Sequence, residues 1–405
     1  MQLRRSYNRR MFGFKKHRIY LDYASAPPVL PAAEKAVLEA SHFIGNPGAI
    51  HSEGVAAKAA LEDARTRIAA LIGCKSKEII FTSGLTEANN LSILGFARKL
   101  AFAKTNFSGT HWIVSSIEHA SVLDAFAEIE RLGGRVTHID PDEKGIIRPE
   151  TVTLALRPET VFLSVGWANN ELGVVQPLAD IASTLREHEE KYRGTVLFHS
   201  DAGQAPLYLP TLVNSLGVDL LSIGANKLYG PHGIGTLFVS KRAELAGITL
   251  GGKQERRLRA GTENVALACG FAAAYEVIAH ERKAESERLA GLRDELSTQL
   301  LDTIPGVVIN GDTRHSLPHM LNISIPNVSS EYVTLSLDHE GIAISTKSAC
   351  REGEESRSHA VEALGGEVWR AENTFRFSLG RDTRAADIRR TVRAIAAILA
   401  RHAKS

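Results

Sequence analysis

Hydrophobic and polar positions follow two different periods between residues 54 and 264. Apolar residues recur every three or four positions in 54–73 and 84–100, a pattern that predicts amphipathic helices. Short runs rich in β-branched and aromatic residues lie between helical segments and predict strands. The strand-like runs cover 78–83, 111–116, 135–140, 160–165, 195–201, 218–224 and 235–240. Strands that alternate with helices indicate the α/β class, with a mostly parallel sheet and helices on both faces.

The pattern changes near residue 265. A long helical stretch leads into shorter strand-like runs with fewer helices between them, and a helical pattern over 384–405 ends the chain. This style predicts a smaller α+β domain. The predicted division is a basic leader over 1–18, an N-terminal segment over 19–30 that packs with the small domain, a large domain over 31–264 and a small domain over 265–405.

Composition and charge exclude several classes of protein. The 405 residues are 44% hydrophobic and 23% charged, with a net charge of +2. These values indicate an ordinary globular protein and give no sign of a nucleic-acid or membrane partner. The first 18 residues are basic, contain no acid and lack the apolar core of a secretory signal. Two interpretations stay open for them: a disordered leader, with Met11 as an alternative start, or a weak organelle-targeting peptide.

The three cysteines differ in their surroundings. Cys74 follows an apolar helical run and Cys269 lies inside another, so both are expected to be small buried hydrophobic residues, whereas Cys350 lies among polar residues. Positive charge at Lys347 and Arg351 favours a thiolate at Cys350. A reactive thiol and an idle loop thiol both remain possible at this stage. The spacing matches no metal site, and so few cysteines indicate a reducing, cytoplasmic location.

Two strand ends carry residues typical of Schiff-base chemistry. Lys227 follows the run 218–224 and precedes a glycine-rich turn, and Asp201 ends the run 195–201. A lysine amine can bond to a carbonyl ligand, and a carboxylate can pair with the ring nitrogen of pyridoxal phosphate. The ordinary alternatives are a surface lysine and an acid that caps a helix.

Three further strand ends carry polar groups. Thr86 opens a helix, where free N–H groups suit a phosphate, although a plain helix cap is the ordinary alternative. His119 follows the run 111–116, and Asn169 and Asn170 follow the run 160–165. Because open α/β sheets bind ligands at the carboxyl ends of their strands, these positions together predict one ligand site.

Several motifs resemble those of the cysteine desulfurases, pyridoxal 5'-phosphate enzymes of the class V aminotransferase group. TSGLTEANN, NNELGVVQP, DAGQA, NKLYGPHGIG, RAGTEN and a SAC loop follow in family order. The resemblance runs from IYLDYASAPPV to TFRFSLGRDT. It implies fold type I of the pyridoxal-phosphate enzymes, with a mostly parallel sheet of the seven-stranded type, and a homodimer.

The resemblance also implies a role for each cofactor residue. Lys227 would carry the cofactor and move protons, Asp201 would hold the ring nitrogen, Gln204 would contact the ring hydroxyl, and His119 would stack on the ring. The positions expected at the phosphate are Leu85, Thr86, Gly224 and Asn226, with Thr262 reaching the phosphate of the neighbouring subunit. Asn170 would contact the cofactor and, with Arg376, hold the substrate carboxylate by charge-assisted hydrogen bonds.

Cys350 gains a role from the same resemblance. Its thiolate would take the sulfur of L-cysteine as a persulfide, release L-alanine and pass the sulfur to an acceptor or iron–sulfur scaffold protein, or to tRNA thiolation. Lys347, where the family usually has a small residue, is expected to lower the pKa of the Cys350 thiol by charge attraction. Selenocysteine lyase, another class V enzyme and a non-catalytic scaffold are the alternatives.

Three departures from the family pattern concern the phosphate. Gly224 and Asn226 stand where the family usually has serine and histidine before the lysine, and Leu85 replaces an alanine. Asn226 can still donate a hydrogen bond, whereas Gly224 offers only its backbone. The departures predict weaker phosphate binding unless another residue compensates, and His232 is a candidate.

Overall fold

A seven-stranded sheet forms the centre of the larger part of the protein. The computed structural model describes residues 18–346 and 357–403, so that Lys347, Cys350 and Arg351 lie outside the described residues. The strands are β2 (Ile79–Thr82), β3 (His111–Ser115), β4 (Arg135–Ile139), β5 (Thr160–Ser164), β6 (Leu197–Asp201), β7 (Leu220–Gly224) and β8 (Gly235–Val239). Their order is β2-β8-β7-β6-β5-β3-β4, and β8 runs antiparallel to both neighbours. The predicted mostly parallel sheet is confirmed.

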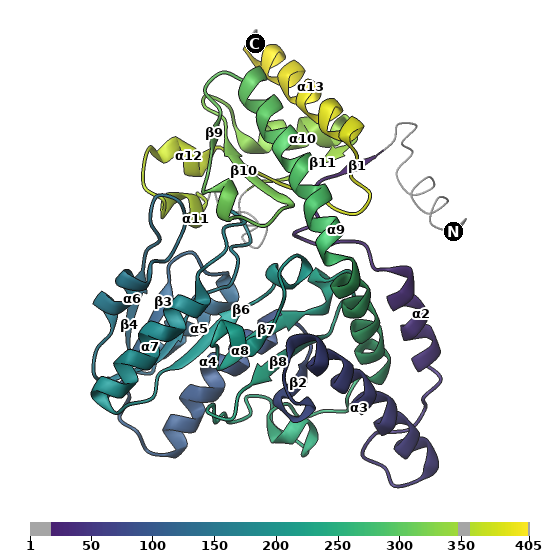
Figure 1. Cartoon of the computed structure of the whole chain (residues 1–405), viewed down its shortest axis with the longest axis vertical. Coiled ribbons are helices and arrows are strands. Elements are labelled where there is room, and N and C mark those ends of the chain that lie inside the picture. Colours follow the sequence, from purple (N-terminus) through teal and green to yellow (C-terminus); the bar gives the residue numbers. More distant parts are fainter. Residues whose placement is uncertain (1–17, 347–356, 404–405) are drawn as a thin grey trace.

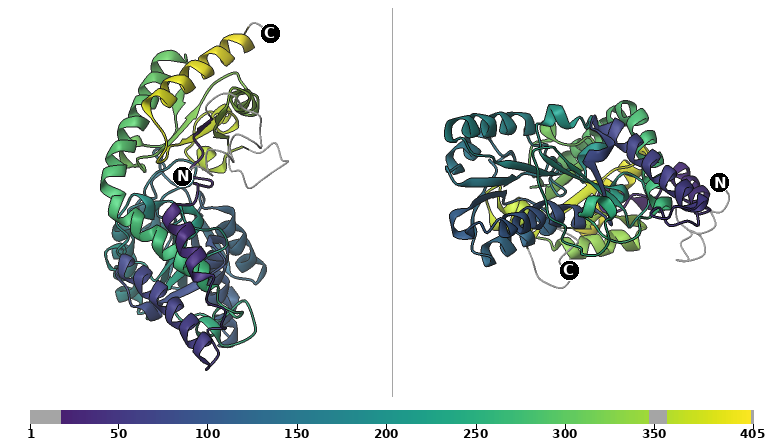
Figure 2. Two further views of the ribbon diagram at one scale, coloured as in Figure 1. Left: turned by 90° about the vertical axis from the view of Figure 1, so that its right-hand side faces the viewer. Right: turned by 90° about the horizontal axis from the view of Figure 1, so that it is seen from below.

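Helices lie on both faces of this sheet (Figures 1 and 2). On one face, α4 (Leu85–Phe102) and α5 (Ala120–Arg131) enclose a core that includes Trp112, Phe126 and Phe162. A second core includes side chains of the helices α3, α6, α7 and α8. These helices are α3 (Ser52–Ile72), α6 (Pro149–Ala155), α7 (Leu178–Tyr192) and α8 (Val213–Leu216). The strands other than β4 are buried along nearly their whole length, which explains their apolar runs in the sequence, whereas the edge strand β4 exposes Arg135 and His138.

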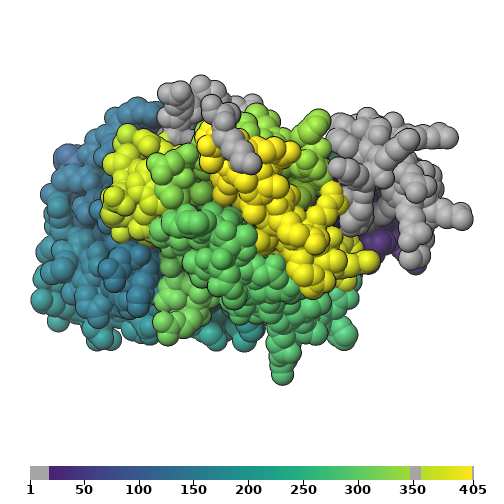
Figure 3. Space-filling model, turned by 90° about the horizontal axis from the view of Figure 1, so that it is seen from above, coloured from purple at the N-terminus to yellow at the C-terminus, as the bar shows by residue number. Residues whose placement is uncertain are grey.

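A four-stranded antiparallel sheet forms the second, smaller part. Its order is β12 (Ser345–Thr346), β13 (Thr374–Ser378), β10 (Met320–Ser324) and β9 (Val308–Ile309). The helices here are α10 (Ser330–His339), α11 (His359–Glu362), α12 (Val368–Glu372) and α13 (Ala385–His402). Helix α13 packs against the long helix α9 (Val265–Thr303), and Figure 3 shows it in yellow beside the green of α9.

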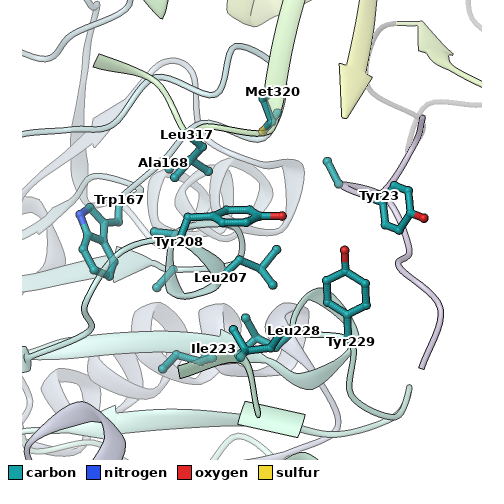
Figure 4. Packing of buried hydrophobic residues seen from close by; sticks show 14 of the residues in the cluster. Tyr23, Trp167, Ala168, Leu207, Tyr208, Ile223, Leu228, Tyr229, Leu317 and Met320 are labelled. Carbon is teal, nitrogen blue, oxygen red and sulfur yellow. The ribbon is translucent and has the colours of Figure 1, made fainter. Parts of the chain in front are cut away.

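The two parts share one hydrophobic core. Figure 4 shows Leu317 and Met320 on one side of Tyr208 and Leu207, with Tyr229 and Tyr23 close by. Helix α9 contacts α2 (Pro31–Ala40) and α3 as well as α13, so it belongs to both parts. The predicted boundary at residue 265 is the first residue of α9, and the division into two domains stays a prediction.

The N-terminal segment crosses from one part to the other. Strand β1 (Ile19–Tyr20) pairs in parallel with β11 (Ile342–Ala343), and the backbone N–H of Ser378 donates to the carbonyl of Leu21. The following residues then turn toward the carboxyl edge of the large sheet. This route places residues 22–25 between Arg376 and Lys227.

Two cysteines lie within the described residues. Cys74 and Cys269 are half-buried against the main core, less enclosed than the sequence predicted. Burial raises the pKa of the Cys74 thiol to about 12 and also raises the pKa of Cys269. Both thiols therefore stay protonated at neutral pH. Among the helices that the structure describes, none combines the length and apolar character needed to cross a bilayer.

Candidate active site

A cavity of about 480 Å³ opens at the carboxyl edge of the large sheet, where the small sheet faces it. Most of the predicted site residues line it: Leu85, Thr86, His119, Asn169, Asn170, Asp201, Gln204, Asn226, Lys227 and Arg376. His232, the candidate for compensation, lines it too, whereas Gly224 and the exposed Thr262 do not. The cavity is thus lined by the loops that follow five strands of the large sheet and by Arg376, which belongs to a strand of the small sheet.

Lys227 ends the short 3-10 turn that follows β7. Its Nζ donates to the carbonyl oxygens of Ala24 and Ser25 at 2.9 and 2.7 Å. The sequence did not indicate these partners, because they lie about 200 residues earlier in the chain. The available signal was their place in the IYLDYASAPPV motif. The two carbonyls hold the amine at the cavity wall.

Asp201 belongs to a hydrogen-bonded chain that ends at His119. One carboxylate oxygen accepts from the Gly203 N–H at 2.8 Å, and the other accepts from Nδ2 of Asn89 at 2.7 Å. The same Asn89 nitrogen donates to Oγ of Ser121 at 2.9 Å, and this oxygen lies 2.9 Å from Nδ1 of His119. The Ser121 N–H also donates to Nδ1, which places the proton of a neutral imidazole on Nε2.

Gln204 supplies a buried amide to the cavity. Its Nε2 donates to the Ala24 carbonyl at 2.9 Å, while Oε1 has no hydrogen-bond partner among the described residues. A buried acceptor without a partner is unfavourable and suits a site that takes a polar ligand. Together with the amine of Lys227, the carboxylate of Asp201 and the imidazole of His119, this amide fits pyridoxal phosphate.

The turn before α4 is shaped for an anion. Gly84 has φ 154° at the N-cap position, and no side chain caps the helix in this part of the structure. Glu87 accepts from the Ser83 N–H at 2.6 Å and from Nε of Arg259 at 3.1 Å. Burial alone would raise the pKa of Glu87, but the bonds from Ser83 and the charge of Arg259 hold it below its usual range. The exposed Thr86 and the first-turn amides remain available for a phosphate.

Arg376 reaches the cavity from β13 and is almost fully buried. It donates to the carbonyl of Asn170 at 2.8 Å, to the carboxylate of Asp22 at 2.8 Å and to Oγ of Ser25 at 2.7 Å. Its Nε is buried without a partner among the described residues. Asn169, by contrast, uses its side chain to hold the turn through Ile117, Glu171 and Leu172. Asn170 is therefore the member of the asparagine pair placed beside the guanidinium.

Glu118 is a cavity residue that the sequence analysis did not single out, although it precedes His119. It is 5% exposed, and Oε1 accepts from the Gly166 N–H at 2.7 Å. Burial raises the pKa of Glu118 to about 8, and the nearby charge of Asp201 adds to this effect. The protonated form of Glu118 carries no charge beside Asp201.

Comparison with known proteins gives a family and several full-length relatives. The aminotransferase class-V family model matches residues 19–391. A cysteine desulfurase IscS from Dictyoglomus turgidum is 39% identical over 382 residues, which are 93% of each chain. A solved NifS-like protein superposes with a TM-score of 0.86 at 28% identity and covers 95% of this chain and 100% of its own. A structure described as SspA in complex with cysteine gives 0.76 at 33% identity, over 89% and 98% of the two chains.

Proposed function

The chain belongs to the aminotransferase class-V family, and from this membership we propose that it is a cysteine desulfurase dependent on pyridoxal phosphate. The observation that carries the proposal is the meeting of Lys227, Asp201, His119 and Arg376 at one cavity. A Schiff-base lysine, a partner for the ring nitrogen and a carboxylate anchor are what amino-acid chemistry on this cofactor requires.

Asp201 binds the cofactor, and Arg376 binds the substrate. Bound pyridoxal phosphate supplies an electron sink for the carbon atom that carries the amino group. Asp201, fixed by Asn89 and Gly203, presents a carboxylate that holds a proton on the ring nitrogen. Arg376 binds the carboxylate of L-cysteine, and the bound carboxylate competes with Asp22 for the guanidinium.

Two groups then handle protons. When its amine leaves the carbonyls of Ala24 and Ser25, Lys227 can take the proton from the substrate α-carbon and return it. The backbone N–H of Ser121 donates to Nδ1 of His119 and fixes the orientation of the imidazole ring. The Nε2–H group of this ring can then donate a proton in a constant direction.

Sulfur removal is assigned to Cys350, which lies outside the described residues. Its thiolate attacks the sulfur of the bound cysteine, the bond from sulfur to the β-carbon breaks, and the carbon fragment takes up a proton and leaves as L-alanine. The product on the protein is a persulfide. Positive charge at Lys347 favours the thiolate that this step needs.

The proposal also covers the phosphate contacts, a homodimer, the acceptor of the sulfur and the location in the cell. Thr86 and Asn226 contact the phosphate, with His232 as an additional donor. Thr262 is exposed and reaches the site of a second subunit in a homodimer. An acceptor or iron–sulfur scaffold protein receives the sulfur, and the location is cytoplasmic.

Product release tests the proposal. Purified protein is given pyridoxal phosphate, L-cysteine and a reductant, and alanine and sulfide are quantified for the wild type, Cys350→Ala and the control Cys269→Ala. Equal amounts of both products from the wild type and the control, and none from Cys350→Ala, would support the assignment. Cofactor binding without products would contradict it, and faster turnover of selenocysteine than of cysteine would favour selenocysteine lyase. Failure to bind the cofactor would favour a scaffold.

A further inference from the structure

Leu85 and Gly224 lie close together beside the turn before α4, the end of the cavity proposed to bind the phosphate. Leu85 is the first residue of α4, and Gly224 is the last residue of β7. A Cβ atom built on Gly224 would lie 2.8 Å from Cγ and 2.9 Å from Cδ1 of Leu85. It would also lie 2.9 Å from Oδ1 of Asn226. Carbon atoms in real structures do not approach so closely, so a side chain at 224 needs Leu85 to move.

Leu85 also packs over a second glycine. A Cβ atom built on Gly203 would lie 2.9 Å from the same Cδ1 atom. The leucine therefore packs across two glycines, one after β6 and one at the end of β7. Leu85 lines the cavity, whereas Gly224 is buried and does not.

We infer that Leu85 and Gly224 form one steric unit that excludes a side-chain hydroxyl from the phosphate end of the site. The inference rests on the proposed function for the identity of the ligand, a phosphorylated pyridoxal. The two sequence departures at these positions are then one coupled change, because the larger residue at 85 occupies the space that a serine at 224 would need. Asn226, Thr86 and backbone amides are left to bind the phosphate.

The steric unit predicts different effects for the two single substitutions and for their combination. A serine at 224 gains a hydroxyl but is crowded by Leu85, whereas an alanine at 85 leaves an unfilled space. Only the combination provides both the hydroxyl and the space that Leu85 occupies, and the side-chain amide of Asn226 must also turn away from the added Cβ atom. The effects of Gly224→Ser and Leu85→Ala should therefore be strongly non-additive, as expected for residues in contact.

Thermal unfolding of the full chain tests the steric part, with and without saturating pyridoxal phosphate. Gly224→Ser is expected to lower the Tm by about 1–4 °C through overcrowding. The double variant Leu85→Ala/Gly224→Ser should lose clearly less than the sum of the single losses. Gly194→Ser is the control, because a Cβ atom there meets nothing within 4 Å. Additive losses would overturn the inference.

Ligand affinity tests the phosphate part without any turnover of cysteine. The Kd values of pyridoxal phosphate and of pyridoxal are measured on the cofactor-stripped full chain by the change in ligand absorbance. The ratio of the two Kd values isolates the contribution of the phosphate. The double variant should raise this preference for the phosphorylated form by about tenfold to a hundredfold over wild type, the effect of one hydrogen bond to a charged group.

The two tests separate this inference from the proposed function. An unchanged Kd ratio in the double variant would overturn the exclusion of a phosphate-binding hydroxyl, even if the wild type releases alanine. A raised ratio in a protein that never turns over cysteine would support the steric unit and contradict the desulfurase assignment.

Discussion

Asn89→Asp would place a second carboxyl group against Asp201. Nδ2 of Asn89 lies 2.7 Å from the Asp201 carboxylate, and Asn89 is fully buried. The substitution keeps the size of the side chain and replaces a donor by an acceptor. Two charged carboxylates at this distance repel each other by about 6 kcal/mol at an effective dielectric constant of 20.

Holding one proton between the two carboxyl groups is less costly than this repulsion. To keep a carboxyl with an ordinary pKa of about 3.9 protonated at pH 7 costs about 4 kcal/mol. The variant is therefore expected to be about 4 kcal/mol less stable than wild type at pH 7. The new folded-state pKa is raised, so the deficit appears as the pH rises above about 4 and is nearly absent below it.

Thermal unfolding measured between pH 4 and pH 8 checks this expectation. The entropy of unfolding of a 405-residue chain is about 0.85 kcal/mol/K, so a deficit of about 4 kcal/mol corresponds to roughly 5 °C in Tm at pH 7. Asn90→Asp is the matched control, because Nδ2 of the half-buried Asn90 bonds to the main-chain oxygen of Thr86. A Tm difference between Asn89→Asp and wild type that does not change with pH would refute the reasoning.

Three further substitutions test other charged groups. Glu255→Gln should lower the free energy of unfolding by about 3–5 kcal/mol, because Glu255 accepts from both terminal nitrogens of the buried Arg65 at 2.7 Å. A loss below about 1 kcal/mol, measured by unfolding in urea, would contradict this expectation. Burial lowers the pKa of His199 to about 3, so its contribution to stability is lost as the pH falls below about 6.5. His199→Gln should flatten the pH dependence of Tm between pH 6.5 and 3, and an equally steep profile would speak against the assignment. Arg376→Lys should raise the KM for L-cysteine at least about tenfold with a smaller change in kcat, and a purely kcat effect would argue against a carboxylate anchor.

The sequence predicted the features that depend on local pattern. Continuous apolar runs predicted the strands of the large sheet because both of its faces are covered by helices. The positions of Lys227, Asp201 and His119 followed from one rule, that strand ends of a parallel sheet meet at the same edge. The family resemblance then gave each residue a predicted role.

Other features depend on contacts between distant residues. Asp22 contacts Arg376 and Ser25 contacts Lys227 across separations of 354 and 202 positions, and no local pattern shows such contacts. The fit between Leu85 and Gly224 depends on how a helix start and a strand end approach each other. Glu118 could have been noticed as an acid next to His119, but its burial could not.

The contact between the N-terminal segment and β13 imposes an order on biosynthesis. Ser25 and Arg376 are separated by 351 positions in the chain. At a translation rate of about 5–20 residues per second, Arg376 is synthesised roughly 20–70 s after Ser25. During this interval residues 22–25 have no Arg376 to contact, and the cavity lacks the residue that we propose binds the substrate carboxylate. A ribosome-bound chain can therefore form the contacts between residues 22–25 and Arg376 only after residue 376 has left the ribosome.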